Sequence, residues 1–406
     1  MAEGVGRTVA ALGTTQTLAW ASSYYLPAML AVPMAQSLGV TVSTVFAAFS
    51  AALVVSAILG PFSGRAIDRW GGKPVLLISN LIFALGLAAL ATARGTAGLF
   101  AAWLVIGLAM GSGLYEAAFS AVVRLYGSRS RGAITGITLL AGFASTVGWP
   151  LSSFVESHYG WRSACLTWAI LHLVLGLPLN LSLPRARLHL AAVAAPEDRQ
   201  SDSDTPLPAN TRRAAMALSF VFASTWFVST AMAAHLPRLL QLTGASLAAA
   251  LVAGALVGPA QVAARLLEYG FLRRLHPLLS ARLASLLHPL GAVVLAMAGA
   301  PAAAVFGVLH GAGNGILTIA KGTLPLALFG PHGYGERQGL LMVPARIAQA
   351  FAPLVFGYCL DRWGAGALLL SGSLSLMAFG VLLTLPRTHR DRTAAVSDGN
   401  AFVSNQ

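Results

Sequence analysis

Three ionisable side chains lie inside long apolar segments: Glu116, Lys321 and Arg346. Charged groups at membrane depth are costly and tend to mark solute or ion pathways. A guanidinium holds a carboxylate with two hydrogen bonds, so Arg346 is the candidate contact for an anionic ligand. Glu116 is the candidate proton carrier, or else a fixed counter-ion of the two basic groups. The alternatives are a structural pair with a loop residue for Arg346 and snorkelling to the nearer surface for Lys321.

A second polar pair lies on one face of the segment that also contains Lys321. His310 is chemically able to carry protons, and Asn314 follows one helical turn later. We therefore count both residues as candidates for ligand binding, and His310 also for proton coupling. A lone histidine is more often a hydrogen-bonded packing residue, and this interpretation stays open here.

Two polar-aromatic patches, at residues 22–25 and 224–227, match each other in type and order. Matching positions in two repeated segments suit the walls of a cavity between the repeats. Ordinary helix packing is the alternative interpretation for such polar residues. The candidates for the cavity wall are Ser23, Tyr24, Tyr25, Thr225 and Trp226.

The sequence does not indicate other chemistry. It contains no glycine-rich phosphate loop with a Lys-Ser/Thr pair, no zinc-ligand spacing and no nucleophile elbow. Cys165 and Cys359 have no ligand cluster around them and are interpreted as small buried hydrophobes. We expect no catalytic residue, no metal, no cofactor and no enzymatic activity.

The elements that carry these residues must be membrane helices. Of the 406 residues, 56% are hydrophobic and 10% are charged, and the mean hydropathy is +0.73. Soluble domains contain about 25% charged residues, and a helix spans the bilayer with about 20 apolar residues. The composition predicts an all-α membrane protein with about twelve transmembrane helices.

The apolar segments predict six helices on each side of a polar, proline-rich break. The predicted helices are 9–35, 42–64, 74–94, 97–124, 132–157, 162–183, 213–238, 245–267, 278–299, 302–328, 338–360 and 365–386. Residues 1–183 and 212–386 are expected to form two six-helix bundles. A cytoplasmic linker at 184–211 joins them, and a polar cytoplasmic tail follows at 387–406.

The 26 basic residues determine the predicted orientation. Cytoplasmic loops of membrane proteins collect Lys and Arg. Most of the basic residues fall at the termini and in loops on the same side as the termini. We predict a multi-pass protein of the inner (plasma) membrane with both termini in the cytoplasm. These loops also account for the net charge of +13, which therefore does not indicate nucleic acid.

The two halves repeat each other at an offset of about 200 residues, and the repeated positions keep the same order. Among them, Gly107, Gly111 and Gly113 recur as Gly307, Gly311 and Gly313, and Pro150-Leu151 recurs as Pro353-Leu354. Six helices per repeat give both halves the same orientation in the membrane. Such parallel repeats can rock about a site between them, which is the geometry of alternating access.

Residues 64–73 read Gly-Arg-Ala-Ile-Asp-Arg-Trp-Gly-Gly-Lys. They resemble the signature of the major facilitator superfamily between helices 2 and 3, Gly-x-x-x-Asp-Arg-x-Gly-x-Lys/Arg. The resemblance, which extends over nearly the whole chain, implies two pseudo-symmetric six-helix bundles and an acid that latches the inner face against helix 11. It assigns the latch to Gly64, Asp68, Arg69, Gly71 and Lys73. Arg69 and Lys73 could instead serve only as topology determinants.

Departures from the superfamily's patterns argue against a typical drug–proton antiporter. Gly107 stands where the helix-4 proton-antiport signature has an arginine, and residues 148–153 lack the Gly-Pro ending of antiporters. Helix 5 and residues 159–162 are more similar to the monocarboxylate-porter branch, whose acidic first-helix pattern is missing at 18–21. The second-half copy of the latch motif has decayed to Arg265 and Glu268.

These observations predict a secondary transporter that moves a small organic anion together with protons, because the deep basic groups outnumber Glu116. The alternative is proton-driven efflux of a drug or a metalloid. A sensor would need an extra-membrane partner domain, and an intramembrane enzyme would need a catalytic constellation. The expected partners are the solute, protons and the lipid bilayer, and we expect a monomer.

Overall fold

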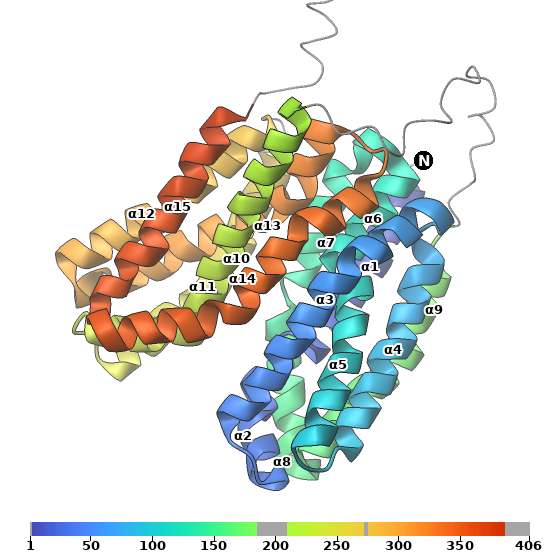
Figure 1. Cartoon of the computed structure of the whole chain (residues 1–406), viewed down its shortest axis with the longest axis horizontal. Helices are drawn as coiled ribbons and strands as arrows, with labels where there is room; N and C mark the ends of the chain where they lie inside the picture. The colour runs from blue at the N-terminus through green and yellow to red at the C-terminus, as the bar shows by residue number, and fades with distance from the viewer. Residues whose placement is uncertain (1, 185–208, 272–274, 386–406) are drawn as a thin grey trace, which may run out of the picture.

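The computed structural model describes residues 2–184, 209–271 and 275–385, which form helices joined by short turns (Figure 1). No β-strand occurs in these described ranges. Most of the predicted linker and the whole predicted tail lie outside them, so the three boundaries between the four predicted segments stay predictions. Helix α10 begins at Ala209, inside the predicted linker.

The first half crosses the membrane six times, and three of its passes are broken. Its helices are α1 (Ala2–Ser22), α2 (Leu26–Leu38), α3 (Val42–Trp70), α4 (Gly72–Thr92), α5 (Gly95–Gly113), α6 (Tyr115–Tyr126), α7 (Arg131–Ala141), α8 (Ala144–Leu171) and α9 (Leu177–Leu181). The pairs α1/α2, α5/α6 and α7/α8 each form one pass with a break. Within α8, Gly160 has a φ of 81°, which ends one pass and begins the next.

The six passes of the second half are continuous helices. They are α10 (Ala209–Leu242), α11 (Leu247–Gly270), α12 (Pro277–Ala298), α13 (Ala303–Phe329), α14 (Tyr334–Trp363) and α15 (Ala367–Thr384). In the described chain, 8 continuous segments are long and apolar enough to span a membrane. The segments 95–181 and 334–384 turn back on themselves, so together with the broken first pass they account for the twelve helices of the predicted fold class.

The breaks in the first half free backbone groups in the middle of the bundle, and nearby side chains satisfy them. The backbone is extended at Leu114, between α5 and α6. The Gln16 side chain donates a hydrogen bond of 2.6 Å to the carbonyl of Gly113 at this break. Backbone groups inside a membrane need such internal partners. The break therefore places the following residues, Tyr115 and Glu116, at the start of a new helix.

The glycines of the internal repeat make equivalent helix contacts in the two halves. A Cβ on Gly107 would lie 2.6 Å from the Ala52 carbonyl of α3, and one on Gly307 would lie 2.5 Å from the Ala253 carbonyl of α11. Small residues allow membrane helices to approach this closely. The repeat seen in the sequence is therefore a repeat of helix packing.

The two halves form separate groups of helices, coloured blue to green and yellow-green to red in Figure 1. Helices α3 and α14 pack against each other across the boundary, with Gly64 of α3 against the backbone of Gly335. We call the end of the bundle where α14 begins the motif end. Large apolar side chains such as Ile58, Met297 and Leu369 are exposed, as expected of a surface that faces lipid.

Candidate functional site

A buried ion pair joins the two halves near their boundary. Glu116 lies in the first turn of α6, and its Oε2 is 2.9 Å from Nη2 of Arg346 on α14. The side chains are 16% and 3% exposed. Arg346 also donates a hydrogen bond of 3.1 Å to the Gln349 side chain, one turn further along α14. The counter-ion interpretation of Glu116 is thus realised in this conformation, with Arg346 as its partner.

Lys321 adds a second buried cation. Its side chain is 4% exposed, and Nζ lies 3.8 Å from the centre of the Trp226 ring. Within the described ranges this Nζ has no hydrogen-bond partner. The Arg346 guanidinium lies 5.5 Å from the centre of the same ring. The cluster thus contains two basic side chains and one carboxylate, and the Lys321 amine lies on an aromatic face instead of beside an anion.

Aromatic rings from both halves enclose these charges. Trp20 of α1 and Trp226 of α10 stack with ring centres 5.9 Å apart and planes 8° apart. Tyr115 packs on Trp20 at 4.8 Å, and Tyr24 meets Trp226 edge-on at 6.3 Å. We call Glu116, Lys321, Arg346, Trp20 and Trp226 the central cluster. It combines two basic side chains and one carboxylate with a flat aromatic surface.

The predicted wall residues of the first helix lie around this cluster. The Tyr24 hydroxyl is 3.3 Å from the Thr230 hydroxyl of the other half. The Tyr25 ring lies edge-on to Trp149, 6.1 Å away. The Ser23 hydroxyl donates a hydrogen bond of 2.6 Å to the Ala19 carbonyl. This hydroxyl therefore bonds to the backbone of its own helix next to the break.

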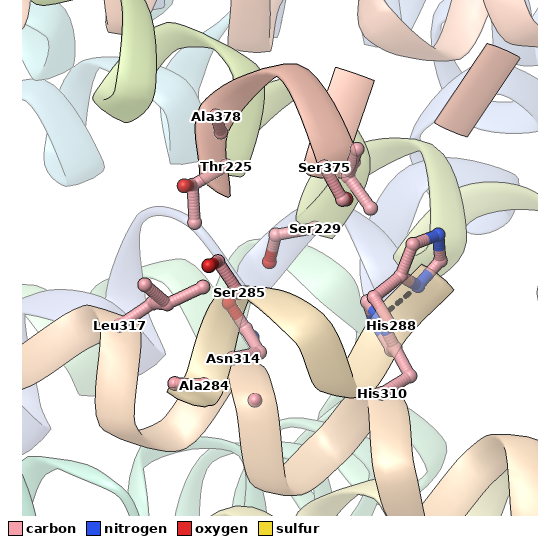
Figure 2. Close-up of a pocket in the computed structure, with 12 residues that line it drawn as sticks. Thr225, Ser229, Ala284, Ser285, His288, His310, Asn314, Leu317, Ser375 and Ala378 are labelled. Carbon is pink, nitrogen blue, oxygen red and sulfur yellow. Dashed lines mark hydrogen bonds between the residues drawn. The ribbon is translucent and has the colours of Figure 1, made fainter. Parts of the chain in front are cut away.

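The other predicted candidates lie in a different place. Thr225, His310 and Asn314 line a pocket inside the second half, between α10, α12, α13 and α15 (Figure 2). His310 Nδ1 is 3.0 Å from Nδ1 of His288, a residue that the sequence analysis did not single out. The predicted binding set therefore divides between the central cluster and this second pocket.

The predicted latch residues gather at the motif end. The Asp68 carboxylate accepts hydrogen bonds from the backbone N–H groups of Gly335 (3.0 Å) and Glu336 (2.9 Å), at the start of α14. Carboxylates are favoured at helix N-termini, where N–H groups lack partners. Arg65 pairs with the Glu336 side chain at 2.7 Å beside this contact. The latch thus joins α3 directly to the other half.

The remaining motif residues act within the first half. Gly71 ends α3 with a φ of 86°, a conformation that L side chains rarely adopt. Lys73 donates to the carbonyls of Leu181 and Leu183 at the end of the sixth pass. Arg69 lies over the neighbouring Trp70 ring at 5.8 Å. In this conformation Asp68 alone of the predicted set bonds across the boundary, with Gly64 providing the close approach.

A second contact across the boundary was not expected from the sequence. Glu268 of α11 is buried and its Oε1 is 2.9 Å from Nη2 of Arg131 on α7. Arg265 donates to the Thr138 carbonyl at 3.0 Å. Arg265 and Glu268 are the remnants of the decayed second-half motif. Arg265 and Glu268 follow Arg65 and Asp68 by about 200 residues, which is the offset of the repeat. This offset could have predicted a contact at their position.

The sequence suggests Trp20, four residues before Tyr24, as an extension of the predicted cavity wall. The structure places its ring in the central cluster, stacked on Trp226. Lys321 could not have been placed in the same way, because the rotation of α13 about its axis decides between snorkelling and burial.

Comparison with known proteins agrees with this architecture. A protein of Thermoproteus tenax, described as an uncharacterised 38 kDa protein in a 23S RNA operon, is 27% identical over 369 residues, which cover 88% of this chain and 90% of that protein. Human monocarboxylate transporter 11 is 28% identical over 361 residues, which cover 83% of this chain and 73% of the transporter.

Solved structures share the fold at low sequence identity. The human organic anion transporter MFSD10 (TETRAN) superposes with a TM-score of 0.67 at 18% identity, covering 93% of this chain and 98% of that one. The proton:xylose symporter XylE, bound to 6-bromo-6-deoxy-D-glucose, gives 0.76 at 12% identity, with coverage of 95% and 96%. The family model of the Major Facilitator Superfamily matches residues 12–305. The chain is therefore a multi-pass membrane transporter that belongs to the major facilitator superfamily.

Proposed function

We propose that this transporter moves a small organic anion, coupled to protons, by alternating access of its two halves. The observation that carries the proposal is that basic side chains outnumber acidic ones in the central cluster. Lys321 is a buried cation without a hydrogen-bond partner in the described chain, next to an Arg346 that already has one. An anion entering the cluster would give Lys321 the partner that burial demands.

The position of the cluster supports a role in transport. Glu116 and Trp20 belong to the first half, and Lys321, Arg346 and Trp226 to the second. A solute bound among them contacts both halves, so its binding energy depends on how the halves are arranged. A ligand shifts a conformational equilibrium only through such differential contacts.

Proton coupling follows from the same ion pair. Protonation of Glu116 would remove its charge and release Arg346, which raises the positive charge available to an anion. Proton binding and anion binding then favour each other, as symport requires. His310 lies in the second pocket and not in the central cluster, so we assign the coupling role to Glu116.

Two of the relatives support an anionic solute, because their names describe a monocarboxylate transporter and an organic anion transporter. The proton:xylose symporter shows that the fold also carries neutral solutes. Two buried cations with a single counter-charge favour an anion over a sugar here. The efflux of a drug or metalloid remains the alternative function, and the direction of transport distinguishes it.

We further propose that the motif end faces the cytoplasm of a cell whose inner (plasma) membrane holds the protein. The predicted distribution of basic residues places both termini on that side. Reaction of single cysteines with an impermeant maleimide, at Arg129 near the motif end and at Thr41 at the opposite end, tests this orientation. Labelling of intact cells at position 129 and not at position 41 would indicate the opposite orientation in the membrane.

The function is tested with the purified protein in liposomes. We expect uptake of labelled organic carboxylates to accelerate under an inward proton gradient, and neutral sugars to be excluded. Glu116→Gln should remove the acceleration but retain exchange of labelled for unlabelled anion. Transport of sugars alone, or anion uptake by Glu116→Gln that still follows the proton gradient, would contradict the proposal.

A further inference from the structure

Two indole rings stack on each other across the boundary between the halves. Trp20 belongs to α1 of the first half and Trp226 to α10 of the second. Their ring planes are 8° apart, and their centres are 5.9 Å apart. Both side chains are buried. This nearly parallel pair is therefore a contact between the two halves and not a contact within one of them.

Alternating access must take this pair apart. When the halves separate, each indole loses the face of the other, and water would meet two apolar surfaces. The exposure of apolar surface to water is unfavourable. A flat ring placed between the two indoles would cover both faces at once. A planar solute is thus favoured at the moment when the boundary opens.

The space for such a ring arises from a short movement. Carbon atoms of neighbouring groups are in contact at about 3.5 Å, so a ring between the two indoles needs their planes about 7 Å apart. In this conformation the centres of the Trp20 and Trp226 rings are 5.9 Å apart, so the slot is closed. Because the two planes are already nearly parallel, separation of the halves leaves a slot with parallel walls.

Nitrogen atoms around the slot call for a ligand that accepts hydrogen bonds. The indole nitrogens of Trp20 and Trp226 and the amide nitrogen of Gln349 are buried and have no partner in the described chain. These three groups donate hydrogen bonds and do not accept them. The Lys321 amine is a fourth buried nitrogen without a partner there. A carboxylate matches this set, because its two oxygens accept about four hydrogen bonds and donate none.

The basic side chains lie beside both walls of the slot. The Arg346 guanidinium is 5.9 Å from the centre of the Trp20 ring and 5.5 Å from the centre of the Trp226 ring. The Lys321 amine is 3.8 Å from the centre of the Trp226 ring. A carboxylate attached to a ring in the slot would therefore have a basic group within reach. Protonation of Glu116 would free Arg346 to bind it.

We propose that the solute is a planar aromatic carboxylate. Its ring would lie between Trp20 and Trp226, and its carboxylate would meet Arg346 and Lys321. This inference rests on the proposed function and narrows its small organic anion to one class. A saturated ring is puckered and cannot contact two parallel faces equally well. An aromatic amino acid would add an ammonium group, which is a further donor beside two basic side chains.

The test compares matched ligands by calorimetric titration of the purified protein at about pH 6, above the usual carboxyl pKa of about 4. Benzoate and cyclohexanecarboxylate are both anions there and differ in the planarity of the ring. We expect benzoate to bind about 2- to 12-fold more tightly, which is the value of one additional aromatic pair. 3-Phenylpropionate should bind at least about tenfold more tightly than L-phenylalanine, which differs from it only by the ammonium group.

Variants of one indole show whether the slot causes the preference. Trp20→Leu should remove the preference for benzoate and retain binding of cyclohexanecarboxylate, whereas Trp20→Phe should retain part of the preference. The ratio of the two affinities is measured on the same folded protein, so it does not depend on the yield of each variant. Trp363→Leu is the control, because this tryptophan is exposed at the end of α14. It should bind both ligands as the wild type does.

Equal affinities of the wild type for benzoate and cyclohexanecarboxylate would overturn the aromatic class and leave anion transport in place. The same holds if Trp20→Leu retains the full preference for benzoate. Binding of L-phenylalanine as tight as that of 3-phenylpropionate would overturn the assignment to a carboxylate without an ammonium group. If the wild type binds none of these carboxylates, the proposed function is itself contradicted.

Discussion

Adding one methyl group at Gly64 should hold the motif end open. A Cβ at this position would lie 1.9 Å from the Gly335 carbonyl oxygen and 2.8 Å from the Glu336 nitrogen. An ordinary contact needs about 3.5 Å, so α3 and α14 would have to separate by about 1.5 Å. That separation also weakens the bonds of Asp68 to the start of α14. Overpacking of this kind costs about 1–3 kcal/mol, which lowers the population of the closed state about 5- to 150-fold.

The assay is the reactivity of a cysteine introduced at Met342, which is buried beside α3 when the motif end is closed. We expect maleimide labelling to accelerate in Gly64→Ala by the same 5- to 150-fold, and net uptake to fall. Gly60→Ala is a matched control one turn away, because its Cβ would meet Gly339 at an ordinary 3.8 Å. If the cysteine at position 342 reacts at the same rate in Gly64→Ala and in Gly60→Ala, and both variants transport equally, the close glycine contact does not control closure.

Three further predictions concern the charges and rings between the halves. Lys321→Met should raise the KM for the anion about 10- to 150-fold, the value of one charge-assisted hydrogen bond; an unchanged KM would remove Lys321 from the site. Glu268→Gln breaks a buried pair and should destabilise the protein by about 3–5 kcal/mol. Glu336→Gln breaks a pair whose side chains are 58% and 39% exposed, so it should destabilise the protein by at most about 1 kcal/mol. Equal losses of stability for the two variants, measured by thermal unfolding, would contradict the difference in burial. Trp226→Leu removes the ring beneath Lys321 and should destabilise the protein by about 2 kcal/mol, the free energy of a desolvated cation–π contact. Trp226→Tyr should retain most of that stability. Equal unfolding temperatures for the two variants would show that the ring face does not hold the Lys321 side chain.

The sequence was sufficient to predict the architecture, because lipid restricts the chain to helices. The length of each helix and the charges that flank it can be read directly from the sequence. The repeat and the residues at 64–73 predicted the superfamily fold, and the comparisons confirmed it. The pairing of Glu116 with Arg346 was among the stated alternatives, since two opposite charges at similar depth seek each other.

The distribution of the polar residues between two pockets could not be predicted. His310 and Lys321 lie on the same helix, yet the first lines the second pocket and the second joins the central cluster. A helical periodicity fixes which residues share a face but leaves open which neighbour that face meets. Only the packed arrangement of α10, α12 and α13 separates the two faces.

The two contacts at the halves' boundary explain why one motif is visible in the sequence and the other is not. Asp68 bonds to backbone N–H groups, and a short side chain reaches them only because Gly64 lets the backbones touch. That geometry requires an aspartate and a glycine at fixed positions. A Cβ on Gly258 or Gly270 of α11 would meet nothing within 4 Å, so no such close approach exists at these points.

Across that wider gap the longer Glu268 side chain meets the long side chain of Arg131. The contact depends on the length of two side chains and not on a close backbone approach, so it places no glycine or aspartate requirement on the sequence around it. The second-half motif has therefore lost its pattern while retaining a contact across the boundary. Glu268→Asp tests this reading, because shortening the side chain by one methylene should break the pair and destabilise the protein nearly as much as Glu268→Gln. Retention of wild-type stability by Glu268→Asp would show that the gap is no wider than the one at Asp68.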